Sequence, residues 1–485
     1  MKRVVSISAI VLSLFIASAV FASGVALTGI GARATALGGA YRGVASDWSA
    51  MYWNPAGLTQ IEGLSAGASF ELIKPVGKYL TVAGVPVYKS EEIENESKTF
   101  PVPAAGIVYG MGKLAVGLAV YAPFGLGAEW DALNTEAYNS SYPAIDFEDD
   151  LQVINIQPTI AYKLSEKLSV GLGVSITWAD IIIRKPTTTP NPLLNDPAYA
   201  GLKQLLLTPM GLASDTYAHI LTEQQLKGDG ISYGASFGLT YKVNEKLTVG
   251  LSGNYYADVS LDGKLNATTY YAAAPAAVVQ QLSQSLDQLI AVNQLTPAQK
   301  MQILGVYSGV KQVKYADAKG DAALPLPMTL GAGVAFKPCD KTLLAADVSW
   351  TQWSSWDVIN IDIEDGSKSE LVENWKDGVR ISAGVERKIT DPLTLRLGYY
   401  TEPTAIPDET ITITIPDPSR RHAINVGVNY ALGIANLYLS YERILIGDRD
   451  VSTWVYNTAA QGYDNMAGTY KMSVNNLMMG LGLAF

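Results

Sequence analysis

A short phrase that occurs twice in the chain is followed both times by strict alternation of apolar and polar residues. Residues 162–172 read YKLSEKLSVGL, and residues 241–251 read YKVNEKLTVGL. In the first copy, every second residue from Leu168 to Trp178 is apolar, and the residues between them are small or polar. The same alternation recurs over 379–385, 393–399, 424–430 and 477–485. Because side chains of a β-strand alternate between two faces, the sequence predicts many strands with one apolar face each.

The alternation favours a transmembrane barrel over a soluble β-sandwich. The non-apolar face is rich in Gly, Ser and Thr, whereas a sandwich exposes long charged side chains to water. The strands reach about ten residues, the length that crosses a bilayer at a tilt. Short turns on one side and long loops on the other are typical of outer-membrane barrels, which have an even number of strands. We therefore predict an all-β, antiparallel barrel of about 14 strands, which begin near residues 63, 100, 113, 150, 167, 230, 246, 325, 342, 374, 392, 421, 434 and 474.

The N-terminus predicts export. Lys2 and Arg3 precede an apolar run from Val4 to Val20, and small residues before Ser23 favour signal-peptidase cleavage. Residues 1–22 are therefore expected to be a signal peptide, with an uncleaved membrane anchor as the alternative. We expect the mature chain in the outer membrane of a diderm bacterium, in contact with its lipid.

Composition excludes several function classes. The net charge of −10 argues against nucleic acid as a partner. The single cysteine, Cys339, cannot form an internal disulfide. Two histidines are too few for a histidine-based metal cluster, so no metal or cofactor is expected. The aromatic C-terminal residue, Phe485, is expected to contact the barrel assembly machinery.

The chain divides into two parts after the signal peptide. Residues 23–62 are rich in Gly and Ala without long alternation, and are expected to form a hatch inside the barrel of residues 63–485. Long insertions at 181–229 and 261–323 are expected to be helical extracellular loops. The predicted helix N-caps are Asp196, Ser214 and Thr296, the last followed by a proline and a capping-box glutamine.

One helix of the second insertion has an apolar face. Val279, Leu282, Leu286 and Leu289 recur at helical spacing. The face has two interpretations: ordinary packing of loop helices on the barrel rim, or an apolar groove that captures ligand.

Several motifs resemble one known family, and they occur in that family's order. They lie at 38–41, 45–47, 53–58, 121–126, 129–130, 326–327, 330–331, 347–354, 374–377 and 415–420. On these motifs the chain resembles the FadL/TodX-type outer-membrane transporters of long-chain fatty acids and hydrophobic compounds. The resemblance covers essentially the whole mature chain.

The resemblance implies a fourteen-stranded barrel closed by an N-terminal hatch. Extracellular loops would catch the substrate, an apolar pocket would hold it, and a kink in the third strand would release it sideways. The matching hatch and gating residues here are Val25, Leu27, Asn54, Pro55 and Ala56.

The kink is also expected from the residues themselves. Pro123 removes a ladder donor, and Gly125 and Gly127 permit a bend, so strand pairing is expected to fail there. The alternative is an ordinary strand end that enters a loop.

Candidate ligand contacts follow from the same comparison. A carboxylate ligand would need a cation, for which Arg184 and Lys185 are candidates. The family's second cation is missing at 356–360, which leaves neutral hydrocarbons or aromatics open. Asp417, Arg420 and Arg421 are expected to form a structural ion-pair network instead. The expected apolar lining is Phe124, Leu126, Trp130 and Trp178, although Trp178 has the strand parity of a lipid-facing aromatic girdle.

Passive uptake of hydrophobic small molecules is the function that these observations favour. Burying about ten methylenes stabilises a bound ligand by about 8 kcal/mol. No energy source is encoded, since Gly29-Ile30-Gly31 lacks the rest of a phosphate-binding loop. A structural or adhesive barrel is the alternative. An outer-membrane hydrolase would have to use His219 or His422, and neither lies in a nucleophile motif.

Overall fold

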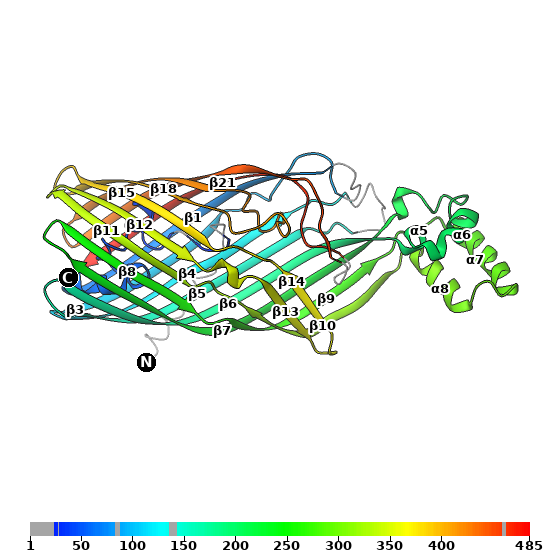
Figure 1. Cartoon of the computed structure of the whole chain (residues 1–485), viewed down its shortest axis with the longest axis horizontal. Helices are drawn as coiled ribbons and strands as arrows, with labels where there is room; N and C mark the ends of the chain where they lie inside the picture. Colours follow the sequence, from blue (N-terminus) through cyan, green and yellow to red (C-terminus); the bar gives the residue numbers. More distant parts are fainter. Residues whose placement is uncertain (1–23, 28, 83–87, 135–142, 458–461) are drawn as a thin grey trace.

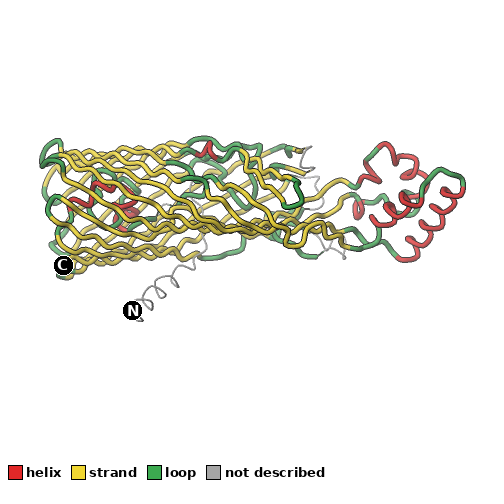
Figure 2. Tube along the Cα trace, turned by 90° about the horizontal axis from the view of Figure 1, so that it is seen from below, coloured by secondary structure: helices red, strands yellow, loops and turns green. Residues whose placement is uncertain are grey.

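Antiparallel strands wrap into one long barrel, and a group of helices stands at its far end, away from the C-terminus (Figure 1, Figure 2). This computed structural model describes residues 24–27, 29–82, 88–134, 143–457 and 462–485. The signal peptide predicted over residues 1–22 lies outside the described residues.

Fourteen strands form the closed wall, as the alternation predicted. The ring closes where the first strand pairs with the last, from Ser65 opposite Ala484 to Thr81 opposite Gly468. Closure leaves no unpaired sheet edge in hydrocarbon, where each unpaired backbone group costs several kcal/mol. In ring order the strands are β1 (Gly63–Thr81), β3 (Phe100–Met111), β4 (Leu114–Trp130), β5 (Phe147–Lys163), β6 (Leu168–Pro190), β7 (His219–Lys242), β8 (Leu247–Tyr256), β11 (Thr329–Cys339), β12 (Thr342–Thr351), β15 (Gly378–Lys388), β16 (Leu393–Glu402), β17 (Arg421–Leu432), β18 (Ala435–Val451) and β21 (Gly468–Ala484).

The alternation sorts the wall into an apolar outer face and a small, polar inner face. On β6, Leu172, Val174 and Ile176 are exposed on the outside, whereas Ser175 and Thr177 are buried inside. This arrangement suits lipid outside and the hatch inside.

Four further strands of the same sheet prolong the wall beyond the lipid-facing band. The long ends of β6 and β7 continue into β9 (Val259–Tyr270), β10 (Lys311–Leu324), β13 (Val358–Ile363) and β14 (Lys368–Val372), which pair in that order. Three short strands complete the set: β2 (Ile93–Glu94), β19 (Tyr456–Asn457) and β20 (Gly462–Tyr463).

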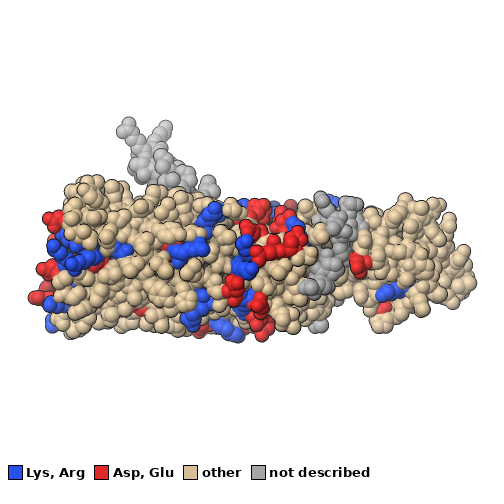
Figure 3. Space-filling view, turned by 90° about the horizontal axis from the view of Figure 1, so that it is seen from above, with Lys and Arg blue, Asp and Glu red and all other residues tan. Residues whose placement is uncertain are grey.

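Two charged rungs cross this prolonged wall. Five aspartates oppose one another on adjacent strands: Asp180, Asp229, Asp262, Asp321 and Asp362. Two residues further out, three lysines do the same: Lys227, Lys264 and Lys319. On the face seen from above, which does not carry these rungs, the space-filling view also shows charged side chains gathered between the wall and the helices (Figure 3). Since Asp180 follows the exposed Trp178 by two residues, the rungs mark where the wall leaves the apolar part of the membrane.

The insertions are helical only at their tips. Residues 181–190 lie in β6, 219–229 in β7, 261–270 in β9 and 311–323 in β10, so the prediction of helix over these parts was wrong. These hairpin arms pair with each other in register, which satisfies their backbone without the alternation that marks lipid-facing strands. The tip helices are α5 (Pro192–Asn195), η2 (Pro197–Tyr199), α6 (Ala200–Leu202), η3 (Lys203–Leu207), η4 (Asp215–Tyr217), α7 (Ala276–Ala291) and α8 (Pro297–Val306).

These tips form a small helical head with its own core. Leu282 and Leu286 are fully buried in a cluster with Leu207 and Ile303. The apolar face of α7 therefore packs inside the head, in agreement with the packing interpretation and not with an open groove. Among the described residues, no helix is both long and apolar enough to cross a membrane.

The three predicted N-cap residues of the head lie at helix N-caps, and two of them cap with their side chains. Thr296 forms the predicted capping box with Gln299. The Asp196 carboxylate accepts a hydrogen bond from the backbone N–H of Ala198 at 2.8 Å. Ser214 is the N-cap residue of η4, so its predicted position is confirmed, but its side chain makes no capping hydrogen bond.

The hatch segment lies against the inner wall. It contains α2 (Ala32–Ala36), α3 (Ala50–Trp53) and η1 (Pro55–Gln60). Two ion pairs tie it to the barrel: Arg42 to Asp347 at 3.2 Å and Arg33 to Glu386 at 2.9 Å. Asn54, which is fully buried, donates hydrogen bonds from its amide to the carbonyl oxygens of Arg42 (2.8 Å) and Leu239 (3.2 Å).

Candidate functional site

A bulge interrupts β4 at the position where the proline predicted a failure of pairing. Along the β4–β5 ladder, Tyr121 opposes Asn155 but Phe124 opposes Val153, so β4 contains one extra residue. The extra residue changes which positions face inward. Below the bulge, odd-numbered residues such as Ala119 and Tyr121 are buried, whereas Phe124 and Leu126 fill the interior above it. The strand continues to Trp130, so the alternative of a strand end at Pro123 was wrong.

The bulge coincides with a gap in the wall. Pairing between β3 and β4 stops at Ala105 opposite Val120. Beyond that point β3 continues to pair with β1 as far as Phe100, and β4 continues to pair with β5. Residues 121–130 of β4 therefore face a side of the barrel on which β3 does not pair with them.

The N-terminal segment occupies the inner side of this gap. The backbone N–H of Leu27 donates to the carbonyl oxygen of Pro123 at 3.0 Å, and the N–H of Gly125 donates to that of Val25 at 2.8 Å. Ala26 lies opposite Phe124 in an isolated antiparallel bridge. Val25 and Leu27 are buried, at 0% and 5% exposure. Three residues of the hatch thus replace the missing strand partner.

A loop closes the outer end of the gap. The backbone N–H of Glu96 donates to the carbonyl oxygen of Glu129 at 2.9 Å, and Lys98 forms an ion pair with the Glu129 carboxylate. On its other side the loop meets β1, where Asn95 donates to the carbonyl oxygen of Gly77 at 3.1 Å. The gap is therefore bounded by the loop on one end and by the β3–β4 ladder on the other.

A cavity lies next to the gap, inside the barrel mouth. Its empty volume is about 700 Å³, which includes space open to solvent. Most of its wall is apolar: Leu126, Phe147, Leu151, Ile181, Ile183, Leu324, Trp356, Ile359, Leu371 and Ile415. Leu126 belongs to the part of β4 that does not pair with β3, so the pocket and the gap share a strand.

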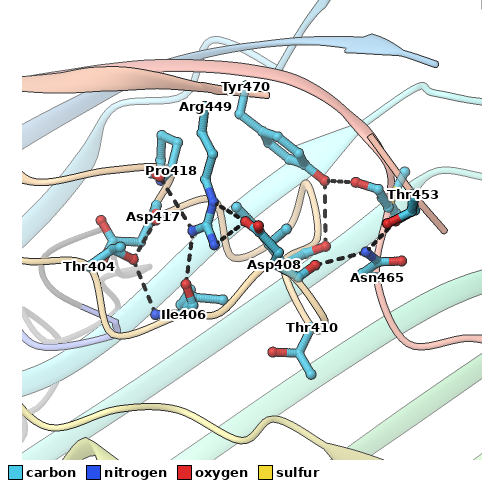
Figure 4. Close-up of polar contacts among 12 residues, drawn as sticks. Thr404, Ile406, Asp408, Thr410, Asp417, Pro418, Arg449, Thr453, Asn465 and Tyr470 are labelled. Atoms are coloured by element: carbon cyan, nitrogen blue, oxygen red, sulfur yellow. Dashed lines mark hydrogen bonds and ion pairs between the residues drawn. The ribbon is translucent and has the colours of Figure 1, made fainter. Parts of the chain in front are cut away.

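The loop between β16 and β17 forms one side of this pocket. Its residues Thr412, Thr414 and Ile415 line the cavity. The close-up shows how the loop is held (Figure 4). Arg449 forms an ion pair with Asp408 at 2.5 Å and donates to the carbonyl oxygen of Ile406 at 2.8 Å, and Asn465 donates to that of Asp408 at 2.8 Å. These contacts fix a segment without regular structure firmly enough to serve as a pocket wall.

The two predicted cations lie on opposite faces of β6. Arg184 has the parity of the outward row and bridges Glu148 (3.2 Å) and Glu223 (3.6 Å). Lys185 has the parity of the inward row, next to Ile183 and Ile181 of the pocket. Only Lys185 therefore has its charge directed at the interior, although both residues contribute atoms to the lining.

Carboxylates accompany Lys185 in the pocket. Asp149 on β5 is 8% exposed, and Glu373 follows β14. The Trp375 indole N–H donates to the Glu373 carboxylate at 2.9 Å. Burial raises the pKa of Glu373 to about 7, against the opposing effects of Lys185 and this hydrogen bond.

Three tryptophans cluster beside the pocket, and one of them, Trp356, lines it. The rings of Trp356 and Trp375 stack with centroids 4.6 Å apart, and Trp353 meets Trp375 at 5.3 Å. Phe124 approaches Trp353 edge-on at 6.5 Å. A side chain at Gly24 would collide with Trp353 and Trp375, so the hatch strand passes directly over this cluster. The positions of these three tryptophans in the sequence gave no indication that their rings are in contact.

Other predicted ligand contacts lie elsewhere. Trp178 is 36% exposed in the outward row of β6, so its assignment to the pocket was wrong and the girdle alternative fits. Trp130 is buried against β1 near Gly77, outside the cavity lining. Asp417 and Arg421 form a buried ion pair at 2.8 Å, as the structural interpretation requires, whereas Arg420 is exposed.

Solved structures share this fold. A FadL homologue of Pseudomonas aeruginosa aligns with a TM-score of 0.70 at 16% identity, covering 95% of this chain and 100% of that chain. The toluene transporter TodX of Pseudomonas putida aligns with a TM-score of 0.66 at 17% identity, covering 95% and 99%.

Sequence comparison points the same way. The long-chain fatty acid transport protein of Salmonella typhi is 23% identical over 407 residues, covering 81% of each chain. Residues 13–485 match the family described as outer membrane protein transport protein (OMPP1/FadL/TodX). The chain therefore belongs to this family of outer-membrane barrels, which transport hydrophobic compounds and are not enzymes.

Proposed function

We propose that the chain takes up hydrophobic small molecules passively, by way of the apolar pocket, and releases them sideways between β3 and β4. The observation that carries this proposal is the hatch strand: residues 25–27 pair with β4 where β3 does not. Among the described residues, two backbone hydrogen bonds hold this segment to β4, each with a net contribution of about 1 kcal/mol. Thermal motion can therefore separate it from β4 without an energy source.

Sideways release suits an apolar cargo. The outer face of β4 just below the bulge carries Val116 and Leu118, which are 37% and 44% exposed toward lipid. A molecule that leaves at the bulge enters hydrocarbon directly and avoids the unfavourable transfer into water. Passage through the barrel interior beneath the hatch would instead bring an apolar molecule against a polar inner wall, which does not stabilise it. Tyr121, Asn155 and Gln157, for example, form a buried hydrogen-bonded cluster there.

Replacing Leu126 in the pocket tests the proposal. Leu126 is 3% exposed and lines the cavity, so Leu126→Gln should weaken hydrophobe binding by about 1.5–3 kcal/mol, which is tenfold or more in affinity. The measurement is uptake of a labelled alcohol, fatty acid and hydrocarbon of equal chain length by cells that express the variant as their only such transporter.

Leu118→Gln is the matched control, because it makes the same change on the lipid-facing side of the same strand. We expect uptake close to that of the unmodified protein, once the amounts of folded barrel are matched. Equal uptake by the two variants, or no uptake above that of cells without the barrel, would refute the proposal.

A further inference from the structure

The charges inside the pocket bear on which hydrophobes it accepts. Lys185 lines the pocket from the inward-facing row of β6, and it interacts electrostatically with both Asp149 and Glu373. Arg184 is already held by two glutamates on the outer side. Three carboxylates line the described pocket, and two of them, Asp149 and Glu373, thus share the inward-facing Lys185. The third, Asp150, lies in the same row of β5 as Glu148, the partner of Arg184.

A carboxylate ligand does not fit this arrangement. Its head group would compete for Lys185 and would lie beside two buried like charges, and such juxtapositions cost several kcal/mol. An ionised carboxylate has only acceptor atoms, so it offers nothing to Asp149 or Glu373.

A pure hydrocarbon does not fit well either. It would strip water from Asp149 and Glu373 and make no hydrogen bond in return, so both carboxylates would lose hydrogen-bond partners that a buried charged group needs. A ligand with a donor group avoids both penalties. Thr412 and Thr414 extend the same polar strip, and Thr414 donates to the Asp149 carboxylate.

We propose that the pocket selects uncharged hydrophobic molecules that carry a hydroxyl group, such as long-chain alcohols and phenols, over both fatty-acid anions and hydrocarbons. The hydroxyl would donate to Asp149 or Glu373 and accept from Lys185, while the apolar wall holds the chain. This inference rests on the proposed function, since it concerns the same pocket.

Three ligands of equal chain length separate the alternatives. We would titrate the purified full-length barrel with hexadecanol, palmitate and hexadecane at a pH of about 8, where Glu373 is ionised. We expect hexadecanol to bind most tightly of the three. Its affinity should exceed that of palmitate by at least about tenfold, which corresponds to about 1.4 kcal/mol. Palmitate or hexadecane binding as tightly as hexadecanol would overturn the inference.

The acid pair provides the mutational test. In the variant Asp149→Asn with Glu373→Gln, the side chains keep their shapes and lose both charges. Palmitate affinity should rise about tenfold, and hexadecanol affinity should fall, since a hydrogen bond to a charged group contributes about 1.5–3 kcal/mol. Asp262→Asn is the matched control: it removes one exposed carboxylate of the charged rung on β9, outside the pocket lining, and should change neither affinity.

Acidity provides a second readout. Below a pH of about 7, Glu373 takes up a proton and loses its charge, so palmitate should bind more tightly as the pH falls from about 8 to about 6. The charged groups that face it are Lys185, Asp149 and Asp464, and the Trp375 indole contacts it directly. Burial also raises the pKa of Asp149 to about 7, so the rise should shrink in Glu373→Gln and be lost in the variant that combines Asp149→Asn with Glu373→Gln. An unchanged rise in the double variant would contradict the assignment.

Failure of this inference is distinguishable from failure of the proposed function. If all three ligands bind but palmitate binds best, the pocket stands and its selectivity is wrong. If none of the three binds and Leu126→Gln changes nothing, the pocket itself is wrong.

Discussion

A disulfide between the hatch strand and β4 is expected to stop uptake. Ala26 and Phe124 are opposite each other, and the two hydrogen bonds that flank them identify a non-hydrogen-bonded antiparallel pair. In such pairs the Cα atoms are about 4.5 Å apart, which lies within the range of disulfides. When the double variant Ala26→Cys, Phe124→Cys is oxidised, it should take up hydrophobes at least about tenfold more slowly. A tenfold change in rate corresponds to a free-energy difference of only about 1.4 kcal/mol.

The controls for this lock use the same protein. Cys339→Ser removes the one native thiol, which is exposed on the turn side of β11. Reduction should restore uptake, and each single cysteine variant should work with or without oxidant. Undiminished uptake by the oxidised double variant would show that the hatch strand need not leave β4.

A side chain at Gly171 is expected to dislodge the hatch and open the barrel to water. Gly171 lies on the inner wall, and a Cβ there would stand 2.4 Å from the carbonyl carbon of Pro55 and 2.5 Å from the backbone nitrogen of Ala56. Gly238, its neighbour across the β6–β7 ladder, is equally close to Asn54. The Asn-Pro-Ala turn therefore presses against two glycines, and backbone atoms in contact cannot rotate away as a side chain can.

Gly171→Val should thus destabilise the folded barrel by at least the 1–3 kcal/mol typical of overpacking. The strain should arise at the contact between the hatch and the wall. The expected result is a large increase in single-channel conductance in planar bilayers and in entry of polar antibiotics into cells. Leu172→Val changes the adjacent residue on the lipid side and should leave both properties unchanged. A closed, non-conducting Gly171→Val barrel would show that the turn does not seal the lumen.

Local patterns were enough to predict the barrel. Lipid-facing strands must alternate, so residues such as Leu172, Val174 and Ile176 reveal a strand without knowledge of its partners. Pro123 likewise marked the interruption of β4, because the loss of one backbone donor is a local property. The hairpin arms at 181–190 and 219–229 lack this signal because both their faces meet water or neighbouring strands, and they were mistaken for helix.

The site depended on contacts that a sequence does not display. Strand parity alone separates Arg184 from Lys185, because Arg184 shares the outward parity of Trp178. The bulge reverses parity within β4, so alternation alone would have placed Phe124 and Leu126 outside, although they had been expected in the apolar lining. Glu373 is far from β5 and β6 in the chain, and only the folded loops bring it to Lys185.

Release of bound ligand from the locked barrel tests the central proposal most directly. The Ala26→Cys, Phe124→Cys protein would be loaded with labelled hexadecanol, oxidised, reconstituted in lipid vesicles and followed as label passes into the bilayer. If the gap beside β4 is the exit, oxidation should leave equilibrium binding intact and slow release by at least about tenfold, and reductant should restore the rate. Equal release from oxidised and reduced barrels would place the exit elsewhere.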